Sequence, residues 1–396
     1  MGLKRFLKSI VSPVEEVKAS RSLTYVSVRQ NGRAVWTPRD YAALAKEGYM
    51  KNPVAYRAVR MIAQAAANTP MILSENHRDL QEHPLLDLLA TPHAGETLSG
   101  LLEALYGHLL TAGNAYLEAV SVGGNLRELH VLRPDRVKVV PGQNGWVEAH
   151  EYTVGGRAHR LQRQEGDVIA PLLHIKSFHP LNDHYGFAPL EAAQTSLDTH
   201  NAASSWNKAL LDNAACPTGA LVYGAGETLN LTDSQFNRLK EELHTSYQGA
   251  SNAGRPLLLE GGLDWKPMGM TPKDMDFIAA KNQASREIAL ALGVPPMLLG
   301  IPGDNTYSTY QEANRAFWRQ VVLPLSKRVL DAISSWVCEP FNRSLKLRVD
   351  LDKVEALSSE RSSLWNRVSA ADFLTEDEKR QAVGYGPKET SSRPHE

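Results

Sequence analysis

The stretch that decides the fold is 271–318, TPKDMDFIAAKNQASREIALALGVPPMLLGIPGDNTYSTYQEANRAFW. Apolar and polar side chains recur there at helical spacing, which predicts an amphipathic helix from Lys273 to Leu292. The rigid turn Gly293-Val-Pro-Pro296 ends this helix, and a small polar loop leads into another. The stretch therefore predicts a helical hairpin without a catalytic cluster at its tip. Such a loop suits a partner that slides past better than a substrate that is held.

A second long helix is predicted upstream, from Pro189 to Asn213, with its proline in the first turn. Alternating apolar residues and glycine-rich turns between the two helices predict a small β-α-β-β unit. Its expected elements are a strand at 219–222, a helix at 233–247, and strands at 257–260 and 264–268 that pair around Gly261-Gly262. The chain is thus expected to carry a small domain on a stalk of two helices.

The residues before this stalk predict a mixed α+β lobe. Asn52-Pro53 has the form of a helix start, and Gly113-Asn114 that of a helix end. Helices are expected from Asn52 to Ala66, at 85–89 and at 97–112, and strands at 71–73, 115–122, 126–132, 136–141, 146–154 and 168–176. Residues up to about Gly48 are expected to be weakly ordered, beginning with a short amphipathic arm.

One more long helix is predicted from Thr309 to Val337. Pro324 lies inside it, removes a backbone hydrogen bond and clashes with the carbonyl of Gln320, so a kink is expected. A strand at 345–351, terminal helices at 359–368 and 375–382, and a disordered tail at 387–396 complete the predicted order.

Composition narrows the class of protein. A chain of 396 residues is too long for one compact core, and 42% hydrophobic with 22% charged residues is typical of an ordered soluble protein. The net charge of -1 argues against a strongly basic surface. Cys216 and Cys338 lack metal-site spacing and fit a reducing cytoplasm. No apolar tract is long enough for a membrane span.

Motifs for catalysis are weak. Ser205-Trp-Asn-Lys208 matches a Ser-x-x-Lys pattern but lies inside a predicted helix and lacks its partner motifs. Gly224-Ala-Gly226 lacks the third glycine of a dinucleotide fingerprint. We therefore expect no catalytic residues, cofactor or metal.

A hydrolase remains an alternative. Three histidines, at 174, 179 and 184, lie five residues apart, and Asp183 lies among them. A site built from His174, His179 and Asp183 is the form this alternative takes. Metal sites prefer other spacings, so structural or surface histidines are the expected outcome.

The helix from Lys273 to Leu292 carries a polar stripe that includes Asp274, Lys281 and Ser285. An ordinary amphipathic surface helix explains this pattern. A helix that lines a wet channel in a ring of copies explains it as well.

Several segments together resemble the portal proteins of tailed bacteriophage heads, in the branch typical of long-tailed siphophages. The matching segments are Asn52-Pro-Val-Ala-Tyr-Arg-Ala-Val59, Tyr185-Gly-Phe-Ala-Pro-Leu190, Asn213-Ala-Ala-Cys-Pro-Thr-Gly-Ala-Leu221, Asn252-Ala-Gly-Arg-Pro-Leu-Leu-Leu-Glu260 with Gly261-Gly262, and Gly293-Val-Pro-Pro-Met-Leu-Leu-Gly300. Each segment alone is a weak indication of this family, whereas the order and spacing of the segments together are specific to it. The resemblance extends to portals of prophages and gene transfer agents.

The resemblance implies the portal fold and its division into parts. These are an N-terminal arm (1–48), a wing (49–188), stem helices (189–216 and 271–293) that flank a clip (217–270), a tunnel loop (294–308), a kinked helix with a wing strand (309–350), a small crown (351–386) and a tail (387–396). The tunnel-loop residues that would face DNA are Ile301, Gly303, Asp304, Asn305, Thr306 and Tyr307. The stem helix would line the channel with Asp274, Lys281 and Ser285.

The resemblance also implies partners. They are further copies of the chain in a ring, usually of twelve; double-stranded DNA, held transiently and without sequence preference; the major capsid protein; the large terminase subunit; and head-tail adaptor proteins. The protein would be part of a virion or phage-like particle assembled in the bacterial cytoplasm. A separate ATPase would supply the energy. An inner-head structural protein without a channel remains a second alternative.

The electrostatics suit a channel. Many Lys or Arg contacts to phosphate would hold DNA tightly, and a translocation pore must let it move. Asp274, Asp276 and Asp304 are placed by the resemblance where they would repel phosphate and centre the duplex.

Overall fold

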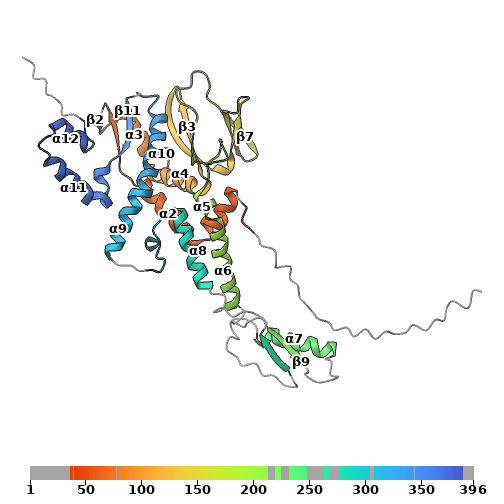
Figure 1. The fold of residues 1–396 in the computed structure, drawn as a ribbon. Coiled ribbons are helices and arrows are strands. Elements are labelled where there is room, and N and C mark those ends of the chain that lie inside the picture. Colours follow the sequence, from red (N-terminus) through yellow and green to blue (C-terminus); the bar gives the residue numbers. More distant parts are fainter. Residues whose placement is uncertain are drawn as a thin grey trace, which may run out of the picture. The chain divides into compact units, whose positions relative to one another are not determined.

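The chain folds as a mixed α+β protein (Figure 1). The computed structural model describes residues 36–38, 40–76, 78–212, 219–223, 232–247, 263–267, 277–303, 307–342 and 344–386. Among these residues, no helix has the length and apolar character needed to cross a bilayer. Most of the predicted arm (1–48), including residues 1–35, the predicted tail (387–396), most of the tunnel-loop tip and Asp274 lie outside the described residues.

Helices α2 (Pro53–Ala67) and α4 (Leu98–Ala112) pack together in the main core. Asn52 caps α2, since its Oδ1 accepts from the amides of Val54 and Ala55 at 3.0 Å. Gly113 ends α4 in the left-handed region, with φ of 70°. Both boundaries confirm the sequence prediction. The buried face of α4 consists of leucines at helical spacing together with a tyrosine: Leu101, Leu102, Leu105, Tyr106 and Leu109.

The strands of this part of the chain form short antiparallel sheets. One sheet has the order β4-β3-β8, from strands Asn125–Leu132, Asn114–Val122 and Leu172–Lys176; a second has the order β5-β6-β7, from Val137–Pro141, Val147–Val154 and Arg157–Leu161. A third has the order β11-β1-β2, from Leu345–Val349, Met71–Glu75 and Arg78–Leu80. The pairing of β11 with β1 brings residues 345–349 beside residues 71–75, far apart in the sequence. The sequence analysis missed β2 and β7, which are short and exposed.

The long helix before β11 changes its winding near Pro324. Helix α9 (Tyr307–Phe317) continues through a π-helical segment (Trp318–Val322) into α10 (Leu323–Val337). Pro324 lies in the first turn of α10, directly after the π segment, where a missing backbone N–H is tolerated. The structure thus accommodates the proline through a change of hydrogen-bond pattern. A bend angle at Pro324 stays a prediction.

Small helices complete the chain. They are α3 (Pro84–Ala90), α11 (Ser358–Ser369) and α12 (Glu376–Ala382). Thr375 and Glu378 form a capping box at the start of α12, with each side chain bonded to the backbone of the other residue. These elements agree with the predicted helices.

Two expectations about order and continuity are wrong. The predicted single helix from Pro189 to Asn213 is two helices, α5 (Pro189–Ala192) and α6 (Gln194–Asp212), with a break at Ala193. Ala193 is buried, and its backbone (φ of -90°, ψ of 8°) departs from helical geometry there, although alanine is the strongest helix former. Residues 41–50, expected to be weakly ordered, form α1 (Tyr41–Ala43) and a π-helix (Leu44–Met50). The burial of Leu44 at 2% exposure stabilises them.

Candidate functional site

Helix α8 (Phe277–Ala291) runs antiparallel to α6, and the two lie side by side (Figure 1). Ser196 Oγ donates to Glu287 Oε2 at 2.5 Å, and the rings of Trp206 and Phe277 stack with centroids 4.3 Å apart. From Ser196 to Trp206 the chain advances along α6 by as many residues as it goes back along α8 from Glu287 to Phe277. This spacing is the one expected for two antiparallel helices. The chain between α6 and α8 therefore leaves and returns at the same end of the pair.

A small β unit lies in that intervening segment. Strand β9 (Gly219–Tyr223) pairs antiparallel with β10 (Leu263–Pro267), and α7 (Asp233–Tyr247) lies between them in sequence. The predicted partner of the later strand was 257–260, which lies outside the described residues. The pairing of β10 with β9 joins the two ends of the unit.

The loop after α8 is anchored by tight turns. Gly293 ends the helix with φ of 70°, and the 3₁₀ turn Pro296–Leu299 is followed by Gly300 with φ of 72°. Ile301 is 6% exposed, and Arg286 of α8 donates to the carbonyl of Pro302. The hydrogen bond of Arg286 thus holds the loop on α8 at Pro302.

The predicted site residues fall in several environments. Lys281 is half-buried on α8, and Ser285 is 6% exposed, with its hydroxyl donating to the Lys281 carbonyl at 2.8 Å. Ile301 is buried and Gly303 exposed, and α9 begins at Tyr307. Asp274, Asp304, Asn305 and Thr306 lie outside the described residues. The structure therefore brings Lys281 and Ser285 onto one helix and does not describe the loop tip.

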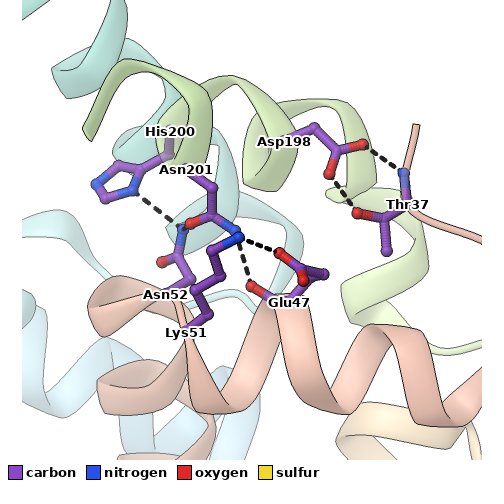
Figure 2. A network of polar contacts seen from close by, with 7 residues as sticks. All are labelled: Thr37, Glu47, Lys51, Asn52, Asp198, His200 and Asn201. Carbon is purple, nitrogen blue, oxygen red and sulfur yellow. Dashed lines mark hydrogen bonds and ion pairs between the residues drawn. The ribbon is translucent and has the colours of Figure 1, made fainter. Parts of the chain in front are cut away.

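A buried polar network joins the start of α2 to the middle of α6 (Figure 2). The Asn52 amide group donates to Asn201 Oδ1 at 3.0 Å and contacts His200 Nδ1 at 3.1 Å. Asn201 in turn donates to the Glu47 carbonyl at 2.8 Å. Burial lowers the pKa of His200, and the charge of Lys281 lowers it further. Neutral His200 is therefore the form that the fold favours.

A second anchor lies one turn earlier on α6. Asp198 accepts from the backbone amide of Thr37 at 3.0 Å and from its hydroxyl at 2.5 Å (Figure 2). Gln194 donates to the Thr37 carbonyl. The residues before α1 thus contact the same face of α6 as Asn52 does.

A third anchor holds the segment that enters α5. Asn114 Oδ1 accepts from the Gly186 amide at 2.7 Å, and the Asn114 amide group donates to the carbonyls of Ala112 and Gly186. Gly186 packs directly against the backbone of Gly113 and Ser177. The helix pair is therefore positioned on the α+β lobe by buried asparagines on both sides.

The residues of the hydrolase alternative have other partners. His174 Nε2 bonds Asn114 Oδ1 at 3.0 Å, and His179 Nδ1 accepts from the Leu181 amide at 3.0 Å. Asp183 accepts from Lys176 through its backbone carbonyl. No group of metal-ligating side chains occurs among the described residues. Ser205 is exposed on α6, and Lys208 pairs with Asp212 at 2.7 Å.

Buried histidines make stability depend on pH. Burial lowers the pKa of His108 to about 4 and that of His174 to about 3. Unfolding exposes both rings, which then take up protons below pH of about 6.5. The free energy of unfolding is therefore highest above that pH and is expected to fall, by up to about 1.4 kcal/mol per pH unit for each ring, as the pH drops toward 4.

Thermal unfolding between pH 7.5 and pH 4.5 measures this loss. His174→Gln is expected to make the dependence on pH shallower, and His159→Gln, on exposed β7, controls for the removal of an imidazole. An unchanged slope in His174→Gln contradicts the assignment.

Sequence reasoning identified Asn52 as a helix cap but missed its contacts with α6. It also missed Asp198, Asn201 and Arg286. These residues stand inside helices and carry no local signal, because a polar residue on a helix becomes informative only when its tertiary partner is known.

Comparisons with known proteins agree on one family. The model of the phage portal protein family matches residues 53–384. A chain from the neck of an empty gene transfer agent (GTA) particle, computed with C6 symmetry, is 53% identical with a TM-score of 0.70, over 90% of this chain and 96% of that one. The chain in the native GTA neck, computed with C12 symmetry, gives 53% identity and a TM-score of 0.67, with the same coverage of both chains.

Sequence relatives extend this result. A protein of Rickettsia bellii is 41% identical over 85% of this chain and 88% of its own length. The probable portal protein of Streptomyces phage phiC31 is 26% identical over 89% of this chain and 81% of its own length.

Proposed function

This chain belongs to the phage portal protein family, and on that basis we propose that twelve copies close into a ring whose central channel passes double-stranded DNA. The observation that carries the proposal is the 53% identity, over 90% of the chain, with the chain of a GTA neck computed with C12 symmetry. Ring closure requires different surfaces on the two sides of each subunit, because the contact is head-to-tail.

In this proposal α6 and α8 are the stem, and the unit between them is the clip. The channel is lined from the α8 side, by Asp274, Lys281 and Ser285, and DNA passes the loop from Ile301 to Tyr307. Lys281 is a charged residue among the described residues that are proposed to line the channel. Its partly exposed side chain supports this assignment, whereas the hydroxyl of Ser285 is buried and supports it less. Few cations in the channel keep phosphate contacts weak, so that DNA moves.

We also propose the surroundings of the ring. It docks the large terminase subunit during packaging and head-tail adaptor proteins afterwards, and it occupies one vertex of a shell of major capsid protein. Assembly takes place in the bacterial cytoplasm, and the particle is of the phage or GTA type. The chain itself is a structural protein, and a separate ATPase supplies the energy for DNA movement.

Negative-stain electron microscopy of the purified protein tests the ring. Rings with a central hole are the expected result, alone or after addition of the coat protein. A monomer or dimer with hydrolytic turnover that is lost in His174→Ala supports the hydrolase instead. Particles that bind the shell without a central hole support an inner-head structural protein and overturn the channel.

A further inference from the structure

Asn52 uses its whole hydrogen-bonding capacity at one buried point. Its Oδ1 accepts from two backbone amides of α2, and its Nδ2 contacts His200 Nδ1 and Asn201 Oδ1, which makes four contacts at 3.0 to 3.1 Å. The side-chain amide can only donate through nitrogen, so His200 Nδ1 must be the acceptor and its Nε2 carries the proton. Asn52 is 0% exposed, so the loss of one partner would leave a buried polar group without a hydrogen bond, which is costly.

The geometry of this residue links two elements. The cap fixes the first turn of α2, which belongs to the main core of the wing. The amide group fixes the middle of α6, which is the stem helix in the proposed function. The bond from Asn201 to the Glu47 carbonyl adds the preceding π-helix to the same junction (Figure 2).

We propose that Asn52 is the positioning residue that sets the stem on the wing: one side chain caps wing helix α2 and holds stem helix α6 through His200 and Asn201. This inference rests on the proposed function for the identity of the stem, while the junction itself rests on the contacts above. The alternative is that Asn52 is a helix cap and nothing more. The two differ in which helix loosens when the amide group is removed.

Hydrogen exchange on the purified full-length protein separates them. Asn52→Ser keeps an N-cap oxygen but is too short to reach α6. In this variant α2 amides are expected to stay protected, while α6 amides near His200 exchange about tenfold faster, which corresponds to two lost hydrogen bonds. Asn201→Ala removes one of these two contacts from the α6 side, together with the bond to the Glu47 carbonyl, and is expected to accelerate exchange of the same amides. The double variant is expected to accelerate exchange by less than the product of the two single effects, because both substitutions break the same Asn52–Asn201 bond.

Thr97→Ala is the matched control. It removes the cap of α4, where Thr97 Oγ1 accepts from the Gly100 amide at 3.2 Å, without touching α6. Unchanged exchange of α6 in Asn52→Ser, or an equal acceleration in Thr97→Ala, overturns the proposal. The ring also provides a functional readout: Asn52→Ser is expected to form rings but to yield fewer DNA-filled particles than Thr97→Ala. If the wild type forms no ring, the proposed function fails, whereas the exchange result still decides the junction.

Discussion

Lysine at both Asp304 and Asn305 is expected to lower the yield of DNA-filled particles by at least about tenfold. The proposed tunnel loop presents these positions to DNA once per subunit, so a ring multiplies the added positive charge. Each lysine that neutralises a phosphate releases counterions and strengthens binding in a way that depends on salt. A channel that binds DNA in this way slows the DNA movement that packaging requires. Raised ionic strength is therefore expected to restore part of the DNA movement in vitro.

The control variant is Gln164→Lys with Glu165→Lys. It changes the charge by the same amount at two exposed positions of the turn between β7 and β8. DNA-filled and empty particles are separated by density, and the fraction filled is compared. Equal yields from the loop variant and the control would remove the loop from the proposed DNA path.

The substitution Gly186→Ala is expected to destabilise the protein by about 3 kcal/mol or more. A Cβ at this position would lie 2.5 Å from the Ser177 amide nitrogen, 2.9 Å from the Ser177 oxygen, and closer still to the Gly113 carbonyl oxygen. All three atoms belong to backbone and cannot rotate away. The bonds of Asn114 to Gly186 would be lost as the loop moves, and the segment that enters α5 would lose its position.

Denaturant unfolding of the purified protein measures this effect, and Gly107→Ala is the control. Gly107 lies inside α4, and a Cβ there would meet no atom within 4 Å beyond its own turn of helix, so alanine is expected to stabilise by about 0.5–1 kcal/mol. A Gly186→Ala variant as stable as the wild type would show that the close approach to Gly113 is not needed.

The sequence predicted the elements whose signals are local. Asn52-Pro53 and Gly113 carry the chemistry of helix ends, and Leu98 to Leu109 carry the periodicity of a buried helix face; both are confirmed. The main antiparallel strands were predicted as well, since their alternation is bounded by turn residues. Family resemblance, carried by segments spread over the chain, predicted the portal fold that the comparisons confirm.

The remaining features depend on contacts between distant residues. The break falls at Ala193, and alanine is a strong helix former, so the local sequence carries no signal for it. The pairing of Ser196 with Glu287 and the junction of Asn52 with Asn201 join residues far apart in the chain. A sequence pattern that repeats every 3.6 residues predicts a helix, but it cannot show which polar residue of that helix bonds to a distant part of the chain. For the channel, the residues that face the axis belong to a ring of copies, so a single chain supplies no local signal for them.

The antiparallel pairing of α6 with α8 bears on how such proteins diversify. Because Trp206 stacks on Phe277 near the far end of the pair, the insertion between the two helices begins and ends at neighbouring points. A module with adjacent termini can be exchanged, shortened or grafted while the framework below it keeps its contacts. In the proposed function this module is the clip, so an exchanged clip is expected to change docking while the contacts of α6 with α8 stay the same.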